Sequence, residues 1–364
     1  MIFFIDIDRE KRNTAGAKAP DDIAYLCLQR GYTRFEMPNF PVEKNKIEKK
    51  IWLLTKYVKW WRKLEAALNK GDVVIYQHPT YGKRVASKMI RRIQKKRKCK
   101  FIAVVHDLES LRGGIQGVIS SNKKTEYYGD TKLLNAFDAV ICHNDSMKKY
   151  MVEVIGLDEK KLVCLNIFDY LSDYTRPIQN KLSNPTIAIA GNLALGKCAY
   201  IYDICTEKYN KNLLVNLYGN NFESSKARDE RLKWNGSFAP ADLPSHLECD
   251  FGLVWDGNSA DTCTGNTGNY LRYNNPHKTS LYLSAGIPVI VWKKAAIAEF
   301  VINNKVGIAV ENLHELDALI GNMKDSEYRD MCENVLHIAE KLRNGKYFYE
   351  ALDYCLADIV RYYE

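Results

Sequence analysis

The sequence predicts an α/β protein built from two doubly wound, Rossmann-like domains. Two features of its 364 residues lead to this prediction. Short apolar runs rich in β-branched residues alternate with helical patterns, and a polar stretch interrupts this alternation near the middle of the chain. The chain is also long enough for two hydrophobic cores and too long for one ordinary core.

The apolar runs have the length and composition of strands in parallel sheets, which are covered on both faces. The first half of the chain holds such runs at residues 2–7, 73–77, 101–105, 139–142 and 162–167. The second half holds them at residues 186–190, 213–218, 251–255, 288–292 and 307–310.

The polar stretch 172–185 contains two prolines and no sustained periodicity, so we expect it to link the domains. The first domain is then predicted over residues 1–171 and the second over residues 186–345. The tail 346–364 has a helical pattern and is expected to cross back to the first domain. Because ligands of doubly wound sheets bind beyond the carboxyl ends of the strands, we expect a site in a cleft that the two domains face.

Positive charge is concentrated in the first half of the chain. Residues 1–180 hold 34 Lys and Arg against 21 Asp and Glu, whereas the remainder holds 19 against 23. This asymmetry indicates a polyanionic partner for the first half: nucleic acid, an anionic membrane surface or a phosphorylated substrate.

The ten cysteines are scattered without the spacing of metal ligands, and no apolar run approaches the ~20 residues of a membrane span. The chain starts without the basic segment and the small-residue cleavage site of a secretory signal. We therefore expect a cytoplasmic protein with reduced thiols.

The strongest local signal is a polar run directly before a helical pattern. It consists of Tyr273, Asn274, Asn275, Pro276, His277 and Lys278. Proline suits the first turn of a helix, and the free N–H groups there, together with the lysine and asparagine side chains, would make an anion pocket that fits a diphosphate. A solvated helix cap is the alternative.

A second signal, Gly191 to Cys198, follows a predicted strand and nearly matches the phosphate loop GxxxxGK[ST]. Asn192 and Lys197 lie within it. Cys198 replaces the hydroxyl that ligates Mg²⁺, and a thiol is a poor ligand for this cation. A P-loop kinase or NTPase therefore stays an alternative, beside a strand-to-helix turn that contacts phosphate through its helix dipole.

Two carboxylates and an imidazole follow another predicted strand: His106, Asp107 and Glu109. An accessible carboxylate or imidazole at a strand end is typical of a general base, and a plain helix cap at Asp107 is an equal alternative. The pair Asp6 and Asp8 resembles a metal-binding Asp-x-Asp, which we interpret as structural. Gly16 comes after the first strand, where a small residue lets the backbone approach a diphosphate.

Residues 46–70 carry apolar side chains at helical spacing, with Trp52, Trp60 and Trp61 among lysines. A basic, tryptophan-rich amphipathic helix is typical of proteins that bind anionic membranes, and the basic run 91–98 adds a second cluster. The alternative is an ordinary surface helix whose apolar stripe packs on the first sheet.

Five of these segments together resemble a known family. The segments 106–114, 166–171, 190–198, 251–257 and above all 261–289 are similar to bacterial β-1,6-galactofuranosyltransferases of surface-polysaccharide assembly. They resemble more distantly the glucosyltransferases that extend O-linked glycans on streptococcal serine-rich adhesins. The resemblance covers nearly the whole chain.

The resemblance implies a GT-B fold with an acceptor-binding domain first and a UDP-sugar domain second. It implies that UDP binds to the segment Tyr273–Lys278, to the loop after Gly191 and near Gly16, and that no metal or cofactor is needed beyond the UDP-sugar donor. Asp107 or Glu109 would be the base, oriented by His106. The acceptor would be a saccharide, expected to be lipid-linked, on the cytoplasmic face of a membrane.

One departure concerns donor binding. Relatives of this kind often carry an arginine after the Gly-Asn pair, where this chain has Ala194, Leu195 and Gly196. Lys197 or Lys278 must then supply the charge.

The alternative from another class of function is a membrane-binding or nucleic-acid-binding module with a decayed site. We expect no nucleic acid partner, because the phosphate-pocket candidates lie in the acidic second half. The sequence does not fix whether the chain forms a homo-oligomer.

Overall fold

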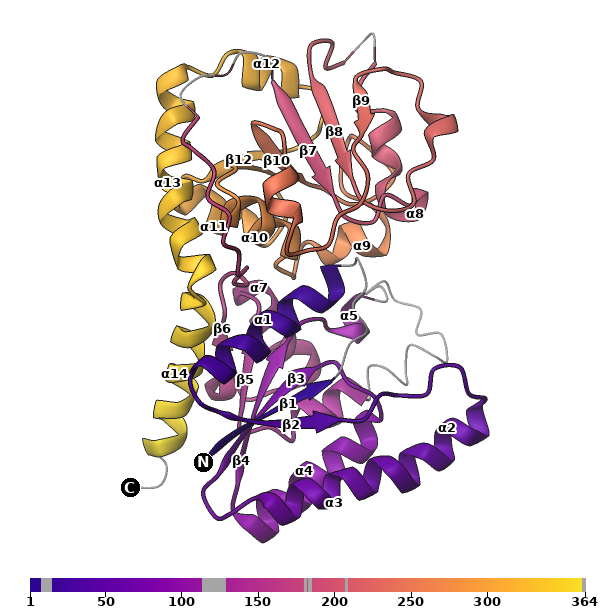
Figure 1. Cartoon of the computed structure of the whole chain (residues 1–364), viewed down its shortest axis with the longest axis vertical. Helices are drawn as coiled ribbons and strands as arrows, with labels where there is room; N and C mark the ends of the chain where they lie inside the picture. Colours follow the sequence, from indigo (N-terminus) through magenta and orange to yellow (C-terminus); the bar gives the residue numbers. More distant parts are fainter. Residues whose placement is uncertain (8–14, 113–128, 180–181, 183–184, 207–208, 362–364) are drawn as a thin grey trace. The chain divides into compact units, whose positions relative to one another are not determined.

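The computed structural model describes residues 1–7, 15–112, 129–179, 182, 185–206 and 209–361 (Figure 1). It divides into two compact units. Unit 1 comprises Met1–Lys11, Pro20–Leu165 and Phe348–Glu364, and unit 2 comprises Arg12–Ala19 and Asn166–Tyr347. Each unit contains one six-stranded parallel sheet with helices around it, which confirms the predicted α/β class.

The sheet of unit 1 has the strand order β2-β1-β3-β4-β5-β6. Its strands are β1 (Ile2–Ile7), β2 (Thr33–Met37), β3 (Val73–His78), β4 (Lys100–Val105), β5 (Ala139–Cys142) and β6 (Leu162–Cys164). Every residue of β3 is buried, as expected for a central strand. The sequence did not predict β2. It is an edge strand with exposed Arg34 and Glu36, so it shows no continuous apolar run.

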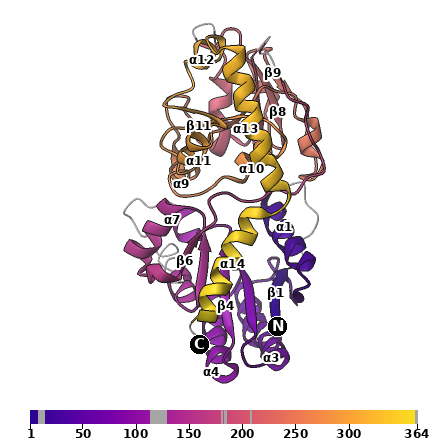
Figure 2. The same ribbon diagram turned by 90° about the vertical axis from the view of Figure 1, so that its left-hand side faces the viewer.

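The helices that belong wholly or mostly to unit 1 connect these strands. They are α1 (Ala15–Gln29), α2 (Lys46–Trp52), α3 (Val58–Ala67), α4 (Lys83–Arg97), α5 (Glu109–Arg112), α7 (Asp145–Tyr150) and α14 (Lys346–Arg361), with π-turns at Leu53–Tyr57 and Met151–Ile155 and a 3₁₀ turn at Glu159–Lys161. Helix α14 lies across one face of the sheet beside α1 (Figure 2). Tyr349 donates to Leu26 O at 3.1 Å and Arg30 pairs with Asp353, which fixes α14 there.

The predicted helix 46–70 is divided into α2, the π-turn and α3. Asn45 caps α2 through a capping box with Glu48. Trp52, Trp60 and Trp61 are 9%, 7% and 0% exposed, and the Trp61 ring stacks on Tyr76 of β3. The tryptophans are core residues, so for their side chains the alternative of an apolar stripe packed on the first sheet is confirmed.

The sheet of unit 2 has the order β12-β11-β10-β7-β8-β9. Its strands are β7 (Thr186–Ala190), β8 (Leu214–Tyr218), β9 (Leu232–Trp234), β10 (Phe251–Val254), β11 (Val289–Trp292) and β12 (Gly307–Val310). The strand that the sequence missed here, β9, is again at an edge and is only three residues long.

The helices of unit 2 are α8 (Leu195–Cys198), α9 (Gly265–Tyr270), α10 (His277–Ser284), α11 (Ile297–Asn303), α12 (Leu316–Gly321) and α13 (Asp325–Arg343), with 3₁₀ turns at Ala199–Tyr202, Ser224–Lys226 and Leu243–His246. Helix α10 is buried between the sheet and α13. Its Tyr282 ring leaves no room for a Cβ on Gly252 of β10, and its hydroxyl accepts from Ala190 N at 2.7 Å. These contacts fix α10 relative to the end of β7.

No helix in the described part of the chain is both long and apolar enough to cross a membrane.

Candidate functional site

In unit 2 the polar loops that follow β7 and β10 lie next to the start of α10. Pro276 occupies the cap position directly before this helix, one residue earlier than the first turn predicted from the sequence. The first N–H groups of a helix have no partner within it and favour an anion. Lys278 stands in this first turn.

Lys278 is held by groups at the end of β10. Its Nζ donates to Trp255 O at 3.0 Å and to Asp256 Oδ1 at 2.8 Å, and only 14% of its side chain is exposed. Lys197 Nζ lies 3.7 Å from Asp256 Oδ2. Burial alone would lower the pKa of Lys278, but the charge of Asp256, its hydrogen bond to Lys278 and the nearby thiols together outweigh burial and raise the pKa. Both lysines therefore converge on one buried carboxylate.

Asp256 was not predicted to take part in donor binding. The signal that could have found it is an acidic residue at the end of an apolar strand run. Its lysine partners are distant in sequence, so no local spacing marks the pair.

The loop after β7 is shaped by a close approach of two backbones. Gly191 has φ 127°, and a Cβ on Gly219 would lie 1.8 Å from Gly191 O. Asn192 Oδ1 accepts from Ala194 N at 3.1 Å and from Asn221 Nδ2 at 2.9 Å. These hydrogen bonds fix the shape of the loop that follows β7.

The helix that follows this loop, α8, has only four residues and ends at Cys198. This thiol is buried, and burial raises its pKa to about 11. A buried, protonated thiol does not ligate Mg²⁺, so the structure does not support a P-loop interpretation.

A hollow of about 450 Å³ lies beside α8. It is lined by Leu195, Gly196, Ala199, Gly257, Asn258, Thr264 and Gly265. The lining residues come from α8, from the loop after β10 and from the start of α9, the same loops that carry Lys197 and Asp256.

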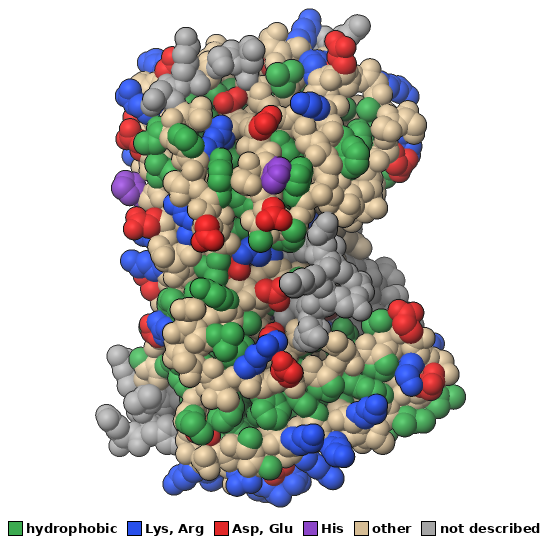
Figure 3. Space-filling model, in the orientation of Figure 1, with side chains coloured by type: hydrophobic (Ala, Val, Ile, Leu, Met, Phe, Trp, Pro, Cys, Tyr) green, Lys and Arg blue, Asp and Glu red, His purple; other side chains and the backbone are tan. Residues whose placement is uncertain are grey.

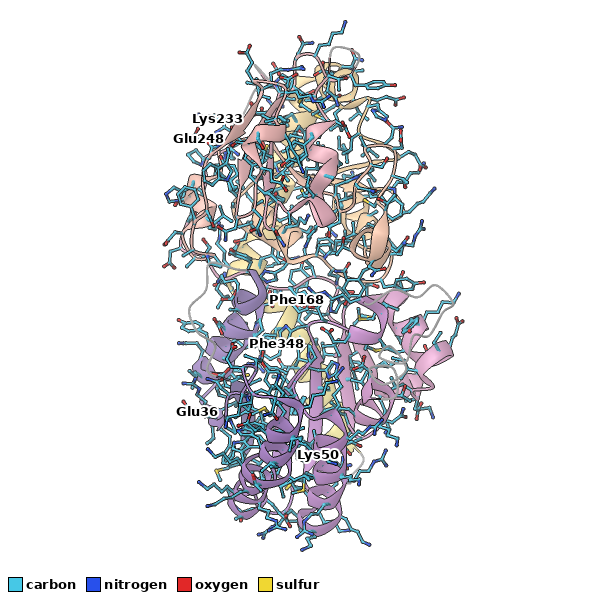
Figure 4. All side chains as sticks on the ribbon, turned by 90° about the vertical axis from the view of Figure 1, so that its right-hand side faces the viewer. Glu36, Lys50, Phe168, Lys233, Glu248 and Phe348 are labelled. Atoms are coloured by element: carbon cyan, nitrogen blue, oxygen red, sulfur yellow. The ribbon has the colours of Figure 1, made fainter. Side chains whose placement is uncertain are left out.

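Three residues of the predicted anion pocket contact protein groups. The backbone N–H of Tyr273 donates to Tyr270 O at 2.9 Å, and Asn275 Nδ2 donates to Asn166 O at 2.9 Å. The His277 ring packs against Phe168 at 5.9 Å, which is labelled in Figure 4. Burial lowers the pKa of His277 to about 3, so the ring is neutral near pH 7. These contacts hold the segment in shape.

Three buried oxygen atoms at the same helix start have no hydrogen-bond partner among the described residues: Asn274 Oδ1, Thr279 Oγ1 and Ser280 Oγ. A buried polar group without a partner costs roughly 1–3 kcal/mol. A bound polar ligand or water would remove this cost, which makes the start of α10 a candidate binding surface.

Gly16, Asp6 and Asp8 are the residues that the sequence singled out at the end of β1 and after it. Gly16 is exposed in the first turn of α1, and a Cβ there would meet nothing within 4 Å, so no neighbouring described residue requires a glycine at this position, and its contact with a diphosphate stays a prediction. Asp6 is buried and pairs with Arg34 at 2.8 Å, which is a structural role. Asp8 lies outside the described residues. Among those described, no group of three or more His, Cys, Asp or Glu residues is arranged to hold a metal ion.

In unit 1, the candidate base residues follow the end of β4, which pairs with β3. His106 Nε2 is 2.9 Å from Gln77 Oε1. Arg112 Nη1 donates to Asp107 Oδ2 at 3.0 Å and lies 3.7 Å from Glu109 Oε1. Burial raises the pKa of Glu109 although Arg112 opposes the shift, which makes Glu109 a stronger proton acceptor than an ordinary glutamate. Arg112 was not predicted as a residue of the site, although the sequence shows that it follows Glu109 by three residues and Asp107 by five.

Comparisons with known proteins cover nearly the whole chain. Residues 2–167 match the family described as glucosyltransferase 3-like, N-terminal domain, and residues 187–355 match the corresponding C-terminal domain. The chain is 33% identical to β-1,6-galactofuranosyltransferase WbbI of Escherichia coli K12 over 99% of both chains. It is 28% identical to glucosyltransferase 3 of Streptococcus gordonii over 77% of this chain and 78% of the relative.

Solved structures agree on the fold. The sucrose-phosphate synthase of Thermosynechococcus elongatus superposes with a TM-score of 0.64 at 11% identity, covering 99% of this chain and 98% of the other. The predicted GT-B fold is confirmed.

The Lys278–Asp256 pair gives a testable prediction about stability. Replacing Lys278 by Ala leaves a buried carboxylate without its nearest cation, which should cost on the order of 3–5 kcal/mol in the free energy of unfolding. Adding Asp256→Asn should recover part of this loss, because the two residues are coupled. Chemical denaturation measures both.

The matched control is Lys293→Ala, which removes the exposed partner of Glu311 and should cost less than about 1 kcal/mol. If Lys278→Ala costs no more than this control, the buried pair does not stabilise unit 2.

Proposed function

We propose that this chain, a glycosyltransferase that belongs to the glucosyltransferase 3-like family, transfers galactofuranose from a UDP-sugar to a saccharide acceptor of cell-surface glycan synthesis. The observation that carries the choice of sugar is the 33% identity to a galactofuranosyltransferase over 99% of both chains. Transfer of glucose from UDP-glucose to a glycoprotein glycan is the alternative, supported by the lower identity to glucosyltransferase 3.

The donor diphosphate is proposed to bind in unit 2 at the start of α10. The helix N-terminus, Lys197 and Lys278 supply positive charge, and the unpartnered hydroxyl groups of Thr279 and Ser280 supply hydrogen-bond donors, whereas the amide oxygen of Asn274 can only accept. Such fixed donors stabilise the charge that develops on a leaving diphosphate, and they do so without a metal ion. Tyr273, Asn275 and His277 shape this segment, and Asn192 shapes the loop opposite it.

The acceptor hydroxyl is proposed to be activated by unit 1. Its oxygen attacks the anomeric carbon, its proton passes to Glu109, and the bond from carbon to UDP breaks with its electron pair on UDP. Glu109 is proposed as the base because burial raises its pKa, and Asp107 is the alternative. This single displacement inverts the configuration, so an α-linked donor gives a β-linkage.

A donor panel tests the proposed function. We expect the purified protein, supplied with nitrophenyl glycosides as acceptors, to release UDP fastest from UDP-galactofuranose and to do so equally in EDTA. Mass spectrometry of the product should show one added hexose.

Faster transfer from UDP-glucose would contradict galactofuranose as the donor sugar and would support the alternative, glucose. Loss of transfer in EDTA with recovery in Mn²⁺ would contradict metal-independent catalysis. No UDP release from any donor would reject the UDP-sugar assignment.

A second proposal concerns the partner of unit 1, an anionic membrane that carries a lipid-linked acceptor. Ile47, Ile51 and Leu54 recur at helical spacing on α2 and the π-turn and are 72%, 55% and 59% exposed. Lys46, Lys50 and Lys56 are exposed in the same segment. Figure 3 shows hydrophobic side chains bordered by lysine and arginine side chains over this part of unit 1. An apolar stripe between cations fits an anionic lipid surface.

Vesicle sedimentation tests the membrane proposal. Binding to anionic vesicles should exceed binding to neutral ones, fall with salt, and fall with Ile51→Asp and with Lys50→Glu, since both kinds of contact contribute. The control is Ile302→Asp, which changes an exposed isoleucine of unit 2 and should leave binding unchanged.

Equal, weak sedimentation with anionic and neutral vesicles at low salt would contradict the proposal. If Ile51→Asp instead converts a dimer into a monomer in gel filtration, the stripe is an interface between copies of the chain.

A further inference from the structure

A buried carboxylate lies behind the short helix that carries Glu109. The side chain of Asp130 is fully buried. Its Oδ1 lies 2.6 Å from Lys83 Nζ and 3.4 Å from His78 Nε2, and its Oδ2 accepts from the backbone N–H of Ser110 at 2.9 Å. Asp130 thus joins β3, α4 and the first turn of α5.

Asp130 is charged in this setting. Burial alone would raise the pKa of its carboxyl group, but the hydrogen bonds and charges of His78 and Lys83 outweigh burial and hold the pKa well below its usual range. A buried anion with two cationic or polar partners keeps a fixed position, because any displacement would leave charges unpaired in a poorly solvated environment.

The hydrogen bond to the backbone of Ser110 places Asp130 next to Glu109, the residue that precedes Ser110 in the chain. Helix α5 has four residues, too few to be stable by itself. Its N–H groups need partners, and Asp130 supplies one from outside the helix. Because the Asp130 side chain has no exposed surface, it cannot touch an acceptor and can act only through α5 and through its charge.

We infer that Asp130 is a positioning residue that orients Glu109 and sets its basicity. This inference rests on the proposed function, in which Glu109 takes the proton of the acceptor hydroxyl. A base must be placed within hydrogen-bond reach of the proton that it removes, and small misplacements reduce the rate strongly.

The charges around Glu109 determine the direction of each test. Arg112 and Lys83 lower the pKa of Glu109, whereas Asp107 and Asp130 raise it, and burial is the largest contribution and raises it. Asp130→Asn removes a negative charge and leaves Lys83 unpaired, so the pKa of Glu109 should fall. Lys83→Gln removes a positive charge, so the pKa should rise.

The kinetic test compares these variants across pH. Asp130→Asn should lower kcat by about 10- to 100-fold, change the KM for the donor less than about twofold, and move the acid limb of kcat/KM to lower pH. Lys83→Gln should move the same limb to higher pH. Both variants weaken the same buried network, so a merely structural role would not move the limb in opposite directions.

The matched control is Asp138→Asn. Asp138 also accepts from a backbone N–H, that of Phe101 at 2.9 Å, and also pairs with a lysine, Lys100 at 3.0 Å, but it directly precedes β5 and contacts the amino end of β4, away from Glu109. We expect this variant to keep the wild-type kcat per folded molecule and the wild-type acid limb, whatever its stability.

A readout without turnover separates this inference from the proposed function. In protein with ¹³C-labelled glutamate carboxyl groups, the Glu109 signal is identified by its loss in Glu109→Gln, and its titration is followed in each variant. If the Glu109 pKa shifts in opposite directions in the two variants but the protein transfers no sugar, the role of Asp130 is supported and the glycosyl-transfer assignment is rejected. Unchanged titration in both variants, or a kcat loss for Asp138→Asn equal to that for Asp130→Asn, would overturn the inference.

Discussion

The parallel pairing of the strands is the constraint on which both candidate sites depend. In each unit all six strands run in the same direction, so every strand ends at the same edge of the sheet. In unit 2 this brings the loops after β7 and β10 together, and with them Lys197 and Asp256. In unit 1 it brings Gln77, at the end of β3, against His106 after β4. Groups far apart in the sequence thereby become neighbours without any local motif.

Each site uses a buried carboxylate that fixes a lysine. Asp256 holds Lys278 at 2.8 Å, and Asp130 holds Lys83 at 2.6 Å. Taking an unpaired lysine out of water would cost several kcal/mol, and the carboxylate offsets this cost while leaving the cation in place. In unit 2, an arriving diphosphate would share the lysines with Asp256. In unit 1, the Asp130 side chain is fully buried, 11% of the Lys83 side chain is exposed, and Asp130 also accepts from the backbone of the neighbouring helix α5.

The sequence predicted the elements that periodicity determines and missed those that depend on distant partners. All ten predicted apolar runs contain strands, because a buried parallel strand has one continuous apolar signature. The missed strands, β2 and β9, are edge strands with exposed faces. In the segment 46–70 periodicity marked apolar positions without saying what covers them, and the structure buries Trp61 while exposing Ile47. Asp130 left no signal of its role, and Asp256 left only that of an acidic residue at the end of a strand run, since the lysine partners of both are tens of residues away.

Isothermal titration of the protein with UDP tests the central claim most directly, namely that the charges gathered at the carboxyl edge of the unit 2 sheet bind the donor diphosphate. Lys197→Ala should weaken UDP binding by about 1.5–3 kcal/mol, the contribution of a charge-assisted hydrogen bond, without the loss of stability expected on removing Lys278. Lys211→Ala, at an exposed lysine of the same unit, should leave the affinity unchanged. Equal affinity of the wild type and Lys197→Ala would contradict the claim.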